Sequence, residues 1–84
     1  MNKRKLLKKV LAGSNTLRFG DLVVLVEAFG FELARTSGSH HIFAHPAVPE
    51  LLNLQDRKGE AKPYQVKQFL ELIEQYALTL EEEE

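Results

Sequence analysis

The feature that most constrains the fold of this chain is the spacing of its apolar residues, which changes from a helical period to strand-like alternation and back. In residues 21–29 apolar side chains recur at i, i+3, i+4 and i+7, which predicts a helix that Gly30 ends. A last helix is predicted from Pro63 to Ala77, because proline suits the first helical position. Between these helices, alternation and turn residues predict strands at residues 31–36, 40–45 and 51–55.

The connections between the predicted strands are short, at residues 37–39 and 47–50, and residues 56–61 form a charged loop before the last helix. Parallel strands need crossovers of about a dozen residues or more, so we expect an antiparallel meander. In the first strand, alternation places Leu33 and Arg35 on the same face. The predicted fold class is therefore α+β with two layers: a three-stranded antiparallel sheet has helices on one face, and its other face is open to a ligand.

The first part of the chain is strongly basic, although the net charge of the whole chain is −1. Residues 1–19 carry six lysines and arginines and no acidic residue. Within them, residues 3–12 predict a short amphipathic helix. Its apolar stripe is Leu6, Leu7, Val10 and Leu11. We therefore divide the chain into a basic extension (1–19), one domain (20–80) and an acidic tail of four glutamates (81–84). This uneven distribution of charge is compatible with a phosphate-binding patch.

The composition excludes several classes of protein. The 84 residues include no cysteine, which excludes disulfides, thiolate zinc sites and a cysteine nucleophile. The longest apolar run, residues 22–26, is too short to cross a membrane. The basic N-terminus lacks the continuous apolar stretch of a secretory signal. We therefore expect a single-domain protein of the cytoplasm.

All three histidines fall within the six residues of the second predicted strand, directly after a glycine–serine turn. Side chains alternate across a strand, so His41 and His45 share a face with Phe43, and His40 lies on the other face. Phe43 is the largest apolar side chain here and the best candidate for the core. The sequence therefore places His40 on the open face of the sheet, beside the turn.

Three uses of these histidines are open. The first is general acid–base catalysis, because imidazole titrates near neutral pH. The second is metal binding, but His41 and His45 would be about 13 Å apart on a straight strand, too far for one zinc ion. We therefore predict no metal site. The third use is structural, in which histidines cap turns or fill a half-buried face. Judged from composition alone, this structural use is the most common of the three.

Residues 38–46, with the sequence GSHHIFAHP, resemble the Gly-Ser-His signature strand of the HicA toxins, and residues 29–31 and 61–70 also fit that family. The resemblance covers about residues 20–78. It implies a fold like that of the double-stranded-RNA-binding domain, α-β-β-β-α, which agrees with the predicted layout. It also implies an endoribonuclease that cleaves mRNA without a metal or other cofactor. The extension before residue 20 and the mixed charge of the loop at residues 56–60 depart from the family pattern.

The resemblance also implies which residues have functional roles and which protein is the partner. A histidine of the motif is required for cleavage in the family, and this role passes to His40, with His41 as the alternative. The residues expected to bind RNA are Gly38 and Ser39 of the turn and the cations Arg57, Lys58, Lys62 and Lys67. The protein that neutralises the toxin is a HicB-like antitoxin encoded beside it, and we expect the antitoxin to cover the His40 face.

Two other functions are compatible with the same residues. The first is a non-catalytic RNA-binding module, which would read duplex RNA by its shape through phosphate and 2′-OH contacts. Such a module would bind RNA in a salt-sensitive way and release no cleavage products. The second is an interaction protein in which the apolar stripe of residues 6–11 is the partner surface and the cations are an ordinary solvated surface. The clustered histidines favour catalysis, because binding alone is better served by lysine and arginine.

Overall fold

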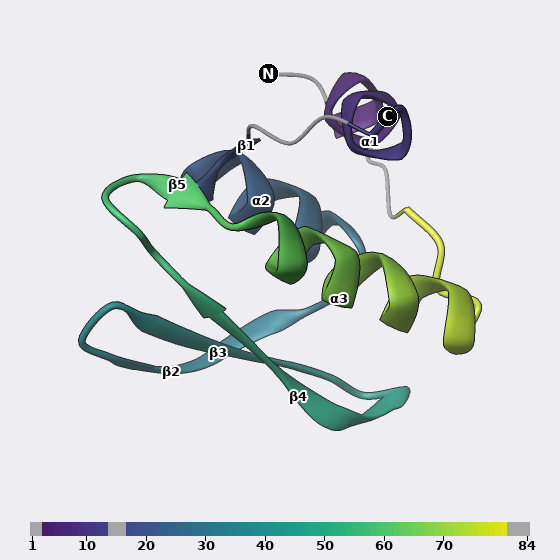
Figure 1. The fold of residues 1–84 in the computed structure, drawn as a ribbon. Helices are drawn as coiled ribbons and strands as arrows, with labels where there is room; N and C mark the ends of the chain where they lie inside the picture. Colours follow the sequence, from purple (N-terminus) through teal and green to yellow (C-terminus); the bar gives the residue numbers. More distant parts are fainter. Residues whose placement is uncertain (1–2, 14–16, 81–84) are drawn as a thin grey trace.

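The computed structural model describes residues 3–13 and 17–80 of the chain (Figure 1). In chain order, the elements are α1 (Lys3–Leu11), β1 (Leu17–Arg18), α2 (Phe19–Ala28), β2 (Glu32–Ser37), β3 (His40–His45), β4 (Val48–Gln55), β5 (Glu60–Ala61) and α3 (Pro63–Gln75). The strands form an antiparallel sheet in the order β2-β3-β4 and a separate two-stranded ribbon, β1-β5. Helices α2 and α3 lie on the same side of the three-stranded sheet (Figure 1). The predicted α+β fold, with an additional N-terminal helix, is confirmed.

The hydrophobic core lies between the three-stranded sheet and helices α2 and α3. Its deeply buried members include Leu22, Leu25 and Val26 of α2, Phe43 of β3, Leu52 and Leu54 of β4 and Phe69 of α3. Phe43 is 1% exposed, which confirms its predicted place in the core. Burial of these apolar side chains is the main driving force for the fold, and it leaves the opposite face of the sheet for polar groups.

Helix α1 also contributes to this core. Leu6 and Val10 are buried in the same cluster as the side chains of α2, whereas Leu11 is 65% exposed. The predicted apolar stripe therefore divides, with one row packed inward and the other at the surface. The acidic tail predicted at residues 81–84 lies outside the described residues. No helix in the described part of the chain is both long and apolar enough to cross a membrane.

Strand β4 begins earlier than the sequence predicts. Residues 47–50 were expected to form a loop, but Val48 is buried and pairs with His45, so the expectation is wrong for Val48 to Glu50. Pro49 is tolerated because β4 is at the edge of the sheet, where a missing N–H costs no ladder hydrogen bond. The end of α3 is tied to this strand, since the Tyr76 hydroxyl donates a hydrogen bond to Glu50 Oε1. That bond raises the pKa of Tyr76.

The charged loop before α3 is more ordered than predicted. Its end forms β5, in which Ala61 pairs with Leu17 of β1, and both residues are buried. The backbone groups of Arg57 and Glu60 hydrogen-bond each other in both directions at 3.1 Å. The Gly59 N–H donates to Asp56 Oδ1 at 2.7 Å. Helix α3 then begins at Pro63, as predicted.

Strand β2 contains a β-bulge that changes the faces of its side chains. The register shifts between Leu33, which is opposite Phe43, and Arg35, which is opposite Ile42. Phe43 faces the helices and Ile42 faces the other side, so Leu33 and Arg35 lie on opposite faces. The prediction that they share a face is therefore wrong, because one inserted residue inverts the alternation that follows it.

Candidate functional site

The histidine strand begins at a tight turn that joins β2 to β3. Gly38 has φ of 59°, in the left-handed region that favours glycine. After it, the Ser39 carbonyl accepts a hydrogen bond from the Asp56 N–H at 2.8 Å. This bond ties the turn to the first residue after β4. The turn, the loop at residues 56–59 and the first residues of α2 and α3 therefore lie at one end of the molecule (Figure 1).

His40 lies on the open face of the sheet, as predicted, and is exposed to solvent. Its Nδ1 is 3.1 Å from Oδ1 of Asn53, which lies on the neighbouring strand β4. An amide oxygen only accepts hydrogen bonds, so this contact requires the hydrogen of the neutral ring to be on Nδ1. The lone pair is then on Nε2, which is the nitrogen that can accept a proton from a substrate.

His41 projects to the opposite face and is half-buried beside the start of α2. Its Nδ1 is 3.2 Å from the Ser39 carbonyl oxygen, and its ring centroid is 4.9 Å from that of Phe19. This arrangement also favours hydrogen on Nδ1. Because His40 and His41 point to opposite faces, they are not placed to act as an acid–base pair on one phosphate. Neither ring is sealed in the core.

His45 has a structural environment. Its Nδ1 is 3.0 Å from the backbone N–H of Ala47, so Nδ1 accepts. Its Nε2 is 3.1 Å from the carbonyl oxygen of Phe29, to which it donates. With both ring nitrogens engaged, His45 joins the β3–β4 turn to the end of α2. Among the described residues, no group of three or more histidines and carboxylates is placed to hold a metal ion.

Gln55 links Ser39, the residue before His40, to a cation. Gln55 is opposite His40 in the register of β3 and β4. Its Nε2 donates to Ser39 Oγ at 3.2 Å, and its Oε1 accepts from Arg57 Nη1 at 3.4 Å. The structure thus brings three predicted residues, His40, Ser39 and Arg57, to one corner of the open face.

The open face also carries groups that the sequence analysis missed. Arg35 lies there because of the bulge in β2, and Asn53 and Gln55 lie there because of the register of β4. In β4, Asn53 and Gln55 alternate with the buried Leu52 and Leu54. This alternation in the sequence indicates that the two amides lie on the face opposite the core. No sequence signal locates a bulge, so Arg35 could not be assigned to this face.

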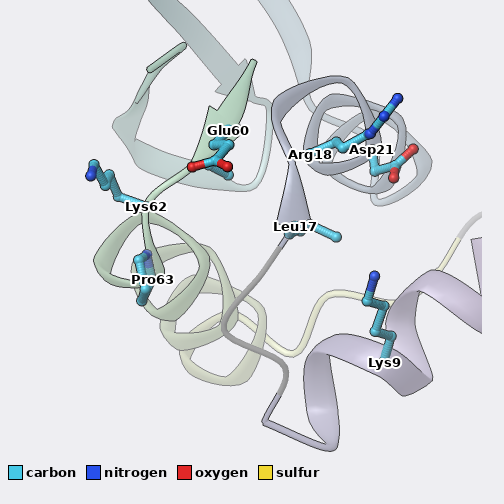
Figure 2. A pocket seen from close by; sticks show the side chains of 8 residues that line it. Lys9, Leu17, Arg18, Asp21, Glu60, Lys62 and Pro63 are labelled. Carbon is cyan, nitrogen blue, oxygen red and sulfur yellow. The ribbon is translucent and has the colours of Figure 1, made fainter. Parts of the chain in front are cut away.

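Two hollows at the same end of the molecule are lined by cations. One, of about 370 Å³, is lined by Arg57, Lys58, Glu60 and Lys62. The other, of about 340 Å³, is lined by Lys9, Leu17, Arg18, Asp21, Glu60, Ala61, Lys62 and Pro63 (Figure 2). They share Glu60 and Lys62, and in Figure 2 the side chain of Lys9 extends from α1 towards β1. Three of the four predicted cations are therefore together, while Lys67 is exposed farther along α3.

A third, apolar groove of about 510 Å³ separates α1 from the end of α3. It is lined by Leu7, Leu11, Phe29, Leu70, Ile73, Glu74, Leu78, Thr79 and Leu80. The exposed part of the predicted apolar stripe thus lines this groove rather than the face that carries His40.

Comparison with known proteins identifies a protein family. A family model described as the HicA toxin of bacterial toxin–antitoxin systems matches residues 19–75, which run from the first residue of α2 to the last residue of α3. No curated protein and no solved structure matches the chain significantly. The matched segment contains the histidine strand, Asn53 and the loop of mixed charge at residues 56–60, and it leaves α1 outside.

Proposed function

The chain belongs to the HicA toxin family of bacterial toxin–antitoxin systems, and from this premise we propose that it is an endoribonuclease that cleaves mRNA with His40 as its general base. Membership confirms the resemblance found in the sequence and makes the chain a toxin with an antitoxin partner. We propose that the partner is HicB-like and that cleavage takes place in the cytoplasm, where mRNA is translated.

The observation that carries this proposal is the environment of His40. Its ring is exposed on the open face, and its contact with Asn53 directs the lone pair to Nε2. In the proposed step, Nε2 takes the proton of an RNA 2′-OH, and the 2′ oxygen forms a bond to the adjacent phosphorus. The bond from phosphorus to the 5′ oxygen breaks, which leaves a 2′,3′-cyclic phosphate, and the 5′ oxygen takes a proton from solvent water. A positioned base of this kind contributes on the order of 10²–10⁴-fold.

Binding of RNA is assigned to the cations at the same end of the molecule. Arg57 is linked through Gln55 to the His40 corner, and Lys58 and Lys62 line the neighbouring hollow. The turn residues Gly38 and Ser39 are adjacent to the proposed base, and Lys67 lies farther out on α3. Contacts of cations with phosphates position a strand without selecting its sequence, so we expect cleavage at many mRNA sequences.

The test is induced expression in bacteria, followed by growth and mRNA measurements. We expect the wild type to arrest growth and degrade mRNA, and His40→Ala to do neither. His41→Ala distinguishes the alternative base. Leu11→Ala, an exposed site on α1 away from the His40 face, serves as the control that stays toxic. Circular dichroism verifies that each variant is folded. Full toxicity of both histidine variants would exclude the proposed mechanism.

A second measurement uses purified protein and RNA in the presence of EDTA. Cleavage under these conditions is expected, because the proposed step uses only an imidazole. Salt-sensitive binding of RNA by the wild type with no cleavage products would instead support the non-catalytic RNA-binding module.

A further inference from the structure

We infer that Asn53 is a positioning residue for His40, which holds the imidazole as the tautomer that can act as a base through Nε2. This inference rests on the proposed ribonuclease function and extends it to a residue of the neighbouring strand. Asn53 is opposite Ile42 in the register, so it lies on the same face as His40 and diagonal to it. Its Oδ1 is 3.1 Å from His40 Nδ1, within hydrogen-bond distance.

The physical reason lies in the two neutral forms of imidazole. A ring without partners exchanges its single hydrogen between Nδ1 and Nε2, and each nitrogen accepts a proton only in the form in which it lacks hydrogen. Asn53 Oδ1 can accept and cannot donate, so it stabilises the form with hydrogen on Nδ1. It also restricts rotation of an exposed side chain. Both effects increase the fraction of His40 that presents the Nε2 lone pair to RNA.

The other polar neighbours of His40 do not supply this contact. Gln55 is directly opposite His40, but its amide bonds Ser39 Oγ and Arg57 Nη1. Ser37, the partner of His40 on β2, has a hydroxyl that can donate as well as accept, so it does not fix a tautomer. The charged groups that face this side of the sheet are Glu32 and Arg35 of β2 and Arg57 of the loop.

The first test is a measurement of the tautomer, which does not depend on activity. Nitrogen-15 NMR of the histidine rings in the full chain is expected to show hydrogen on Nδ1 of His40 and on Nε2 of His45, which is an internal reference with the opposite assignment. In Asn53→Ala, the His40 signals are expected to shift towards a mixture of both forms, with His45 unchanged. If His40 keeps its hydrogen on Nδ1 in Asn53→Ala, the inference is wrong even if the protein is an active nuclease.

The second test is kinetic. Loss of one such hydrogen bond is expected to lower kcat/KM for RNA cleavage about two- to tenfold in Asn53→Ala, with KM unchanged. Asn53→Asp keeps the acceptor and adds a negative charge, which favours the imidazolium, so the acidic limb of the kcat/KM profile should move to higher pH. Leu11→Ala, exposed on α1 and away from the His40 face, is the control.

The outcomes separate the two proposals. An active wild type whose Asn53→Ala variant matches Leu11→Ala in rate and pH profile would overturn the role of Asn53 and leave the nuclease intact. A wild type that cleaves no RNA would overturn the ribonuclease proposal, and with it any catalytic role for Asn53.

Discussion

His45 shows how a single imidazole can hold two parts of a fold together. It accepts from the Ala47 N–H at the β3–β4 turn and donates to the Phe29 carbonyl at the end of α2. Its ring is 5.1 Å from that of Phe31, which is buried in contact with Phe69 of α3. A residue with both ring nitrogens bonded to backbone has a structural role, in contrast to the exposed His40 on the same strand.

We expect His45→Ala to lower the free energy of unfolding by about 1–3 kcal/mol, because it leaves the Phe29 carbonyl and the Ala47 N–H without their partner. His40→Ala, at an exposed position, is expected to change it by less than about 0.5 kcal/mol. Urea denaturation followed by circular dichroism measures both values. Equal stabilities of the two variants would show that the two His45 bonds contribute nothing.

At the scale of elements, the bulge in β2 determines which side chains share a face with His40. It turns Arg35 to the open face, on the edge strand and diagonal to His40. A guanidinium at this place is suited to bind a phosphate next to the one that is cleaved. We therefore add Arg35 to the cations proposed to bind RNA.

Arg35→Gln is expected to weaken RNA binding and to reduce the slope of log affinity against log salt by about one. Glu32→Gln, on the same strand and face, is the control and is expected to leave the slope unchanged or bind more tightly. Titrations of labelled RNA at several salt concentrations, in a His40→Ala background to prevent cleavage, provide the measurement. An unchanged slope in Arg35→Gln would place the RNA elsewhere.

The elements differ in how far the sequence could predict them. The helices from Pro63 and around Leu22 to Val26, and the alternation of His40, His41 and Phe43, follow from periodicity and are confirmed. The predicted faces of the β2 residues after the bulge were wrong. The sequence pattern does not reveal the extra residue, although that residue inverts the alternation that follows it. The ribbon β1-β5 has two residues in each strand, too few for any period. The Asn53 contact depends on the register between strands, which the sequence does not specify.

At the scale of the whole molecule, α1 is part of the structure although the family match begins at residue 19. Leu6 is completely buried and Val10 nearly so, in the same core that supports the sheet. The extension therefore stabilises the domain. Lys9 of the same helix lines the hollow that also contains Arg18 and Lys62.

Leu6→Ala is expected to destabilise the full chain by about 2–5 kcal/mol, the usual cost of a cavity at a buried leucine. Leu11→Ala, 65% exposed on the same helix, is the matched control and is expected to cost less than about 0.5 kcal/mol. Thermal and urea unfolding give the comparison. Similar stability of Leu6→Ala and the wild type would show that α1 does not support the domain.

Both borders of the sheet are unsuited to further pairing. The backbone ladder of β2 is interrupted by its bulge, and β4 carries Pro49, which has no N–H to offer. Irregular edges of this kind prevent a sheet from growing by addition of foreign strands. We therefore expect copies of the toxin not to associate edge to edge. We also expect an antitoxin to inhibit by lying across the His40 face, where the substrate would lie, rather than by adding a strand.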